Sequence, residues 1–220
     1  VSSHTWENGK NEQSHQDPTL CEAWLGEMSD VAPVYFPCDA NTAVAQLAAL
    51  YQQKGRIATV VAAKSVLPVW CDATQAQLAA QQGAITLRHD HQADVQLLAI
   101  GAYQLQEVER AAKRLCAKGV GVSVVAIVEP ARFRMARDAR EAAYVWDDET
   151  VSNIVPEVQN RLFVCHGRPE VMTGVLRRLD TGYQHSRFVG YHNRGGTLDV
   201  FGMLYANKIT WAHIIFYVAE

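Results

Sequence analysis

Short apolar runs alternate with amphipathic segments along most of the chain, beginning near Val34. The runs at 57–63 and 120–128 are continuous rather than alternating, which is typical of strands buried on both faces. Segments 41–51 and 105–118 instead carry apolar residues at helical spacing. Strands that alternate with amphipathic helices predict an α/β fold with a mostly parallel sheet and helices on both faces.

Capping and turn residues mark the ends of these elements. Asp39 or Asn41 caps the first helix and Gly55 stops it, while Gly83 closes a Gln- and Ala-rich helix at 71–82. The other predicted strands are 34–37, 85–88, 95–100, 162–165 and 188–191, and the other predicted helices are 147–155, 169–179 and a closing segment from about 197 to 217, broken near Asn207.

The Gln- and Ala-rich helix marks a boundary between two predicted domains. Residues 1–72 are the tail of one α/β domain, and residues 73–220 form a complete second α/β domain. The polar start of the chain, ahead of any core-forming segment, indicates a piece of something longer.

Composition narrows the function classes. The chain is 49% hydrophobic and 20% charged with a net charge of -3, which is ordinary for a soluble globular protein. No basic excess indicates nucleic acid, and no polybasic run or apolar stretch approaches the ~20 residues of a membrane helix. Residues 1–17 are polar and lack the apolar h-region of a secretory signal peptide. We therefore expect a cytoplasmic protein with neither a nucleic-acid nor a membrane partner.

The five cysteines are odd in number and form no C-x-x-C pair. This argues against a disulfide framework or a zinc site and for a reducing cytosol. Cys38, Cys116 and Cys165 lie in apolar runs and are predicted core residues.

Two further groups of residues could bind a ligand or could simply be polar surface. The arginine-rich stretch 132–148 could hold a phosphate, but a solvated loop or helix face is favoured. His89 and His91 could bind a metal ion, although no further ligand is evident nearby, so a polar link is favoured.

Several motifs, in one order, resemble those of phosphoketolases. The run from Trp6 to Pro18 is similar to the family loop that ends Ser-His-Gln-Asp-Pro, and 35–42 is similar to the family's Leu-Pro-Pro-Asp-Ala-Asn-Thr. The resemblance continues through Val60–Lys64 and His166-Gly167, and then through a closing pattern made of Gly190, Tyr191, Gly195, Thr197, Phe201, Met203, Asn207 and His213. The chain is similar to the C-terminal portion of that family.

The resemblance implies a thiamine-diphosphate enzyme that also uses Mg²⁺. The full-length protein would cleave xylulose 5-phosphate or fructose 6-phosphate with inorganic phosphate, giving acetyl phosphate and an aldose phosphate, and would be a homodimer. Residues 1–72 would end the pyrimidine-binding domain, and 73–220 would be a transketolase-like C-terminal domain. The cofactor and metal sites would lie upstream, so this piece alone would bind neither and would be inactive.

The resemblance also implies roles for four residues. His15 matches the loop histidine, whose imidazole can donate a hydrogen bond or move a proton near neutral pH. Asn11 matches an asparagine at the substrate, and Lys64, at a strand end, matches a lysine that holds the substrate phosphate. Lys10 stands where the family has a histidine; it cannot take over that acid–base role without a large pKa shift, yet it could bind phosphate or stabilise an oxyanion.

Three other positions also depart from the family pattern. Ser65-Val66 replaces Gln-Pro after Lys64, and Gly202 replaces an aspartate. The alternative to an active enzyme is therefore a non-catalytic or redirected relative, whose C-terminal domain serves dimerisation or another interaction.

Overall fold

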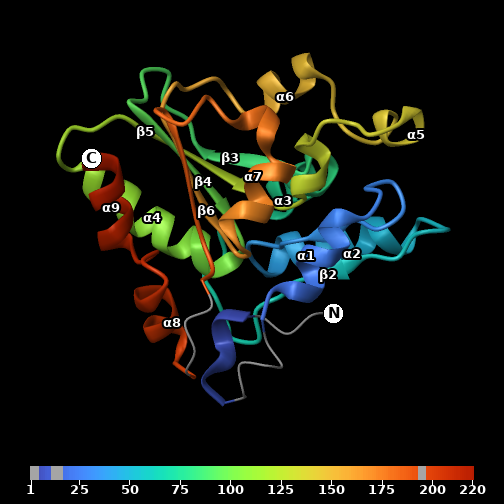
Figure 1. Ribbon diagram of the computed structural model, residues 1–220, viewed down its shortest axis with the longest axis horizontal. Coiled ribbons are helices and arrows are strands. Elements are labelled where there is room, and N and C mark those ends of the chain that lie inside the picture. The colour runs from blue at the N-terminus through green and yellow to red at the C-terminus, as the bar shows by residue number, and fades with distance from the viewer. Residues whose placement is uncertain (1–4, 11–16, 193–196) are drawn as a thin grey trace.

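The computed structural model describes residues 5–10, 17–192 and 197–220, and Figure 1 shows their arrangement. The strands are β1 (Val34–Tyr35), β2 (Thr59–Val60), β3 (Ala84–Arg88), β4 (Val95–Ile100), β5 (Val122–Ile127), β6 (Arg161–Cys165) and β7 (Ser186–Val189). The α-helices are α1 (Thr19–Gly26), α2 (Ala40–Tyr51), α3 (Ala73–Gln82), α4 (Ala102–Cys116), α5 (Ala139–Ala142), α6 (Asp148–Ile154), α7 (Pro169–Val175), α8 (Val200–Ala206) and α9 (Trp211–Ala219). The 3-10 helices are η1 (Thr5–Lys10), η3 (Pro130–Phe133) and η4 (Arg177–Leu179).

The main sheet has five strands in the order β3-β5-β4-β6-β7. β4, β5, β6 and β7 run parallel, and β3 is an antiparallel edge strand on β5. The predicted mostly parallel α/β fold is therefore confirmed. Gly83 lets the chain turn from α3 into the antiparallel strand β3, because its φ of +81° lies in the left-handed region. Its carbonyl accepts from the amides of Val128 and Glu129, and a Cβ would lie 3.2 Å from the Glu129 carbonyl oxygen.

Both faces of this sheet are covered by helices, as its continuous apolar strands predict. Successive side chains of β4 point to opposite faces, so Leu97 and Ala99 join one core while Leu98 and Ile100 join the other. The first core includes residues of α3, α4, α8 and α9, and the second includes residues of α1, α6 and α7. Figure 1 shows α4 and α9 on one side of the strands and α7 on the other.

Residues 17–72 lie against the carboxyl end of β5. The amide of Phe36 donates to the carbonyl of Val128 at 2.8 Å, and the side chain of Gln46 in α2 donates to the same carbonyl at 3.0 Å. β1 and β2 pair in parallel as a separate two-stranded sheet. Since both cores contain residues from either side of position 72, the proposed domain boundary stays a prediction.

Most local predictions are confirmed, with differences at element ends. Asp39 caps α2 through a reciprocal pair of hydrogen bonds with Thr42, and the closing helical segment does break at Asn207. β2 is shorter than the apolar run at 57–63, and the predicted helix at 169–179 divides into α7 and η4. Cys116 is exposed, so its assignment to the core is wrong. No helix among the described residues is long and apolar enough to span a membrane.

Candidate functional site beside the N-terminal helix

The N-terminal 3-10 helix η1 is fixed to the carboxyl ends of two parallel strands. Trp6 is buried, and its indole N–H donates to the carbonyl of His166 at 3.1 Å, directly after β6. The indole ring also packs edge-on against Tyr191, after β7, with ring centroids 6.0 Å apart. Ligand sites of parallel α/β sheets gather at this edge, so η1 begins in the region where a site is expected.

Close backbone approach explains Gly190, a glycine of the C-terminal motifs. A Cβ on Gly190 would lie 2.3 Å from the carbonyl oxygen of Gly167 and 3.0 Å from that of Cys165. That Gly167 carbonyl accepts a hydrogen bond from the amide of Tyr191 at 3.0 Å. Only glycine at position 190 therefore lets the chain carry Tyr191 to the ring of Trp6.

The carboxylate of Glu7 joins η1 to two other segments. It accepts hydrogen bonds from the amides of Lys64 at 2.8 Å and Ser65 at 2.9 Å, and from the hydroxyl of Tyr103 at 2.7 Å. Burial, with a further contribution from the Glu7 charge, raises the pKa of Tyr103 to about 12. The hydroxyl therefore stays protonated at neutral pH and remains a donor to Glu7.

The chain is also anchored at Asp17 and in α1. Arg168 lies 3.5 Å from the carboxylate of Asp17, and its amide donates to Glu22 at 2.6 Å. Its guanidinium also forms an ion pair with Glu22 and lies 5.5 Å from the centre of the Tyr191 ring. Charge-assisted contacts with Arg168 thus hold Asp17 and Glu22, as the contacts of Trp6 and Glu7 hold η1.

The four predicted site residues stand differently in the structure. Lys10 ends η1, which is held against the backbone of Lys64 through Glu7. The side chain of Lys64 is exposed. Asn11 and His15 lie outside the described residues. The roles of all four stay predictions.

The arginine-rich stretch is more engaged with the protein than a solvated loop. Arg132 is half-buried, lies 4.1 Å from the centre of the Tyr144 ring and donates to the carbonyl of Tyr144 at 2.8 Å. Arg134, also half-buried, donates to the carbonyl of Leu25 at 3.0 Å. The solvated interpretation is wrong for these two arginines, because the backbone and the aromatic rings of the protein replace water around them. It also fails for Arg137, which donates to the carboxylate of Glu141 at 2.7 Å and to the carbonyl of Gly26 at 2.7 Å. It holds for Arg140, whose side chain is 80% exposed.

Two buried carboxyl groups in this region had no sequence signal. Glu129 follows β5, and its carboxylate accepts a hydrogen bond from the hydroxyl of Tyr144. Burial raises the pKa of Glu129, although the nearby Arg132 charge and the Tyr144 hydroxyl oppose the shift. Glu141 accepts from the hydroxyl of Ser29 at 2.7 Å. The two hydroxyl donors lie 15 and 112 positions away in the sequence, so the local sequence did not indicate these contacts.

The described residues contain one group of three potential metal ligands, Cys38, Asp39 and Cys71. Mg²⁺ prefers oxygen ligands, so a set with two thiols does not suit it. The residues described here therefore do not fit a diphosphate-bound Mg²⁺. His89 and His91 are 3.1 Å apart at their ring nitrogens and belong to no such group in the described part of the chain.

Comparison with known proteins identifies the relatives of this chain. Residues 1–53 match the family model of D-xylulose 5-phosphate/D-fructose 6-phosphate phosphoketolase. The chain is similar to phosphoketolases. A probable phosphoketolase of Bifidobacterium animalis subsp. lactis is 26% identical over 95% of the chain. This phosphoketolase-like chain spans 26% of that relative's length, which is consistent with the predicted C-terminal portion.

Solved structures show the fold of this phosphoketolase-like chain. The transketolase of Leishmania mexicana superposes with a TM-score of 0.73 at 14% identity, over 99% of the chain and 29% of the transketolase. A split-gene transketolase, described as an inactive β4 tetramer, superposes with a TM-score of 0.67 at 17% identity, over 99% of the chain and 64% of its own length. The predicted transketolase-like fold is therefore confirmed.

Proposed function

We propose that this chain is the C-terminal part of a phosphoketolase that cleaves xylulose 5-phosphate or fructose 6-phosphate with inorganic phosphate. The observation that carries the proposal is the attachment of Glu7 to the backbone of Lys64 and Ser65. It ties η1, which ends at Lys10, to the segment that begins with Lys64. Lys10 and Lys64, the two lysines to which the resemblance gives roles, therefore belong to segments that the Glu7 carboxylate joins.

In this proposal the chain contributes substrate contacts. Lys64 pairs with the sugar phosphate, Asn11 holds a substrate hydroxyl, and His15 donates a hydrogen bond to the reacting oxygen or moves its proton. Lys10 stabilises negative charge on the substrate. Thiamine diphosphate, with Mg²⁺, supplies the carbon–carbon cleavage and would be held by the remainder of the protein.

The same proposal covers location and assembly. The full-length protein would be a cytoplasmic homodimer, and the chain by itself would be inactive because its cofactor site lies elsewhere. The split-gene transketolase, most of whose length this chain covers, is described as inactive, which supports the second point.

The test uses the full-length protein, with acetyl phosphate as the readout. Both ketose phosphates are supplied with inorganic phosphate, thiamine diphosphate and Mg²⁺, and wild type is compared with His15→Ala and Lys64→Gln. We expect His15→Ala to lower kcat by about 10²–10⁴-fold, the usual contribution of a general acid–base group. Lys64→Gln should instead raise KM for the sugar phosphate by about tenfold or more, because one charged contact is lost.

Matched controls separate these effects from general damage. His91→Ala and Lys54→Gln change exposed residues away from η1 and should leave both kinetic constants unchanged. If wild type binds thiamine diphosphate but makes no acetyl phosphate from either sugar, the proposal fails. The alternative, a non-catalytic or redirected relative that serves dimerisation or interaction, would then stand, and Lys10→His would be the first reversion to assay.

A further inference from the structure

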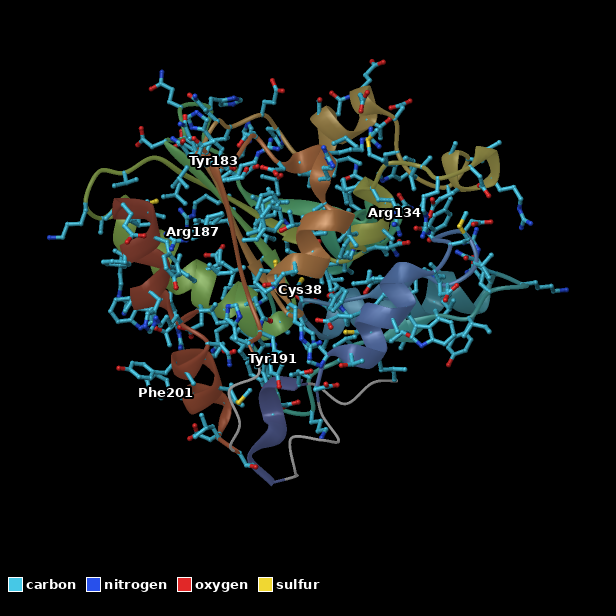
Figure 2. The ribbon with its side chains drawn as sticks, viewed as in Figure 1. Cys38, Arg134, Tyr183, Arg187, Tyr191 and Phe201 are labelled. Atoms are coloured by element: carbon cyan, nitrogen blue, oxygen red, sulfur yellow. The ribbon has the colours of Figure 1, made fainter. Side chains whose placement is uncertain are left out.

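Two cysteines far apart in the sequence meet in the interior of the molecule. The sulfur atoms of Cys38 and Cys71 lie within 4.8 Å of each other, and both residues are buried. Cys38 directly precedes Asp39, the cap of α2, and Cys71 directly precedes Asp72, the cap of α3. Figure 2 labels Cys38 near the centre of the view.

Asp39 fixes this meeting and is not available to a metal ion. One carboxylate oxygen accepts from the amide and hydroxyl of Thr42, each at 2.8 Å. The other accepts from the amides of Trp70 and Cys71, each at 2.8 Å. With two donors on each oxygen, the carboxylate is saturated, and only two thiols remain. Zn²⁺ requires four ligands, so this group does not make a zinc site.

We propose that Cys38 and Cys71 are a dithiol that a small-molecule disulfide, such as oxidised glutathione, converts into an internal disulfide. One cysteine thiolate attacks the small disulfide, forms a mixed disulfide and releases one small thiol. The second cysteine then attacks the sulfur of the first, forms the internal bond and releases the second small thiol. The two cysteines lose two electrons and two protons, and the small molecule gains them.

Access to the pair comes from the segment between β2 and α3. Residues 64–70 have no helix or strand, and Val66 and Val69 are exposed apolar side chains on it. Such a segment opens at lower free energy than the sheet or the long helices. Opening exposes Cys71 first, since Cys71 directly follows the segment.

As long as segment 64–70 has not opened, burial protects the thiols of Cys38 and Cys71 from oxidation. The hydrogen bond with Cys71, followed by burial, raises the pKa of Cys38. Little thiolate is therefore present at neutral pH, and oxidation should be slow and should accelerate as the pH rises. This behaviour distinguishes a buried dithiol from an exposed thiol such as Cys116.

The disulfide would restrict the segment that holds η1 through Glu7. The loop that it closes contains α2, β2 and Lys64, whose amide donates to Glu7. A covalent link across this loop restricts the unfolded chain and the opening of segment 64–70. The oxidised form should therefore unfold at a higher temperature, and its Lys64 and Ser65 amides should exchange more slowly with solvent. This inference does not depend on the proposed enzymatic function.

The experiment treats the folded full chain with oxidised glutathione over a range of pH and then alkylates all remaining thiols under denaturing conditions. Intact mass and peptide mapping are compared for wild type, Cys38→Ser, Cys71→Ser and the control Cys165→Ala. Cys165 is buried in the other core, so its variant matches the loss of a buried thiol. Circular dichroism confirms that each variant is folded before treatment.

We expect wild type and Cys165→Ala to lose the alkylatable thiols of Cys38 and Cys71, besides any mixed disulfide at the exposed Cys116, and to yield one cross-linked peptide pair that contains Cys38 and Cys71. Either serine variant should give at most a mixed disulfide with glutathione and no rise in the unfolding midpoint. The proposal is overturned if both thiols stay alkylatable in the folded protein, or if the cross-link joins other cysteines. Protection by a soft metal ion without any disulfide would also overturn it.

Discussion

Glu7 accepts a hydrogen bond from the backbone amide of Lys64 at 2.8 Å, across 57 positions of sequence. The same carboxylate holds the amide of Ser65 and the hydroxyl of Tyr103. A single side chain thus joins the N-terminal helix, the segment after β2 and the start of α4.

Glu7→Gln should therefore loosen this junction. The amide group cannot accept from all of these donors, and a partly exposed, charge-assisted hydrogen bond contributes about 1–2 kcal/mol. We expect the free energy of unfolding to fall by about that amount and the Lys64 and Ser65 amides to exchange faster in hydrogen-exchange measurements. Glu157→Gln, a change at an exposed residue, is the control. Unchanged exchange at both amides would contradict the contact.

Glu141→Gln should remove a pH-dependent part of the stability. Burial alone would raise the pKa of Glu141, but hydrogen bonds from Arg137 and Ser29 hold it well below its usual range. Its contribution is therefore present above the unfolded value, about 4.3, and is lost as pH falls through the folded pKa. We expect a loss of about 3 kcal/mol at pH 7 and a smaller loss under acid conditions.

Denaturant unfolding from pH 7 to pH 3 checks this prediction. Glu149→Gln removes an exposed carboxylate from the neighbouring helix α6 and is the matched control. A loss for Glu141→Gln that did not change with pH would argue against the charged hydrogen bonds as its source.

Tyr144→Phe should lower the free energy of unfolding by an amount that depends on pH. The hydroxyl that it removes donates to Glu129, a carboxyl group whose pKa is raised rather than lowered. Burial raises the pKa of Glu129 above its unfolded value, so the stability contribution of this group is present below about pH 4.3 and is lost as pH rises through the folded pKa. The hydroxyl of Tyr144 opposes that shift by donating to the carboxylate. Its removal should cost about 1–3 kcal/mol at pH 7 and less at pH 4.

Chemical denaturation at these two pH values measures the difference. Tyr51→Phe removes a hydroxyl from a side chain that is 83% exposed and should change neither value. Equal losses at pH 4 and pH 7 for Tyr144→Phe would count against a role of the hydroxyl in holding the charged carboxylate.

Thiol reactivity should follow burial in the reduced protein. Cys116 is exposed, whereas Cys21, Cys38, Cys71 and Cys165 are buried, and burial raises the pKa of Cys21 to about 12. A thiol-specific reagent should therefore modify one cysteine quickly and the others slowly. Cys116→Ser should abolish the fast phase in a time-resolved labelling assay, and survival of that phase would show that another thiol is accessible.

The local elements and the fold class could be predicted from the amino-acid sequence. Val95–Ile100, which is apolar except for Gln96, became a buried strand because both of its faces need cover. Asp39 and Gly83 set helix ends through a cap and a left-handed turn, whose hydrogen bonds are made with residues within four positions along the chain. The order of the motifs along the chain was likewise enough to indicate the resemblance to phosphoketolases.

The contacts that build the candidate site depend on tertiary packing. Glu7 and Lys64, Glu129 and Tyr144, and Cys38 and Cys71 meet because helices and strands bring separate segments together. The edge position and direction of β3 were open for the same reason, since its pairing with β5 depends on the whole sheet. Periodicity and caps report on a residue's near neighbours, whereas these contacts depend on how the complete chain packs.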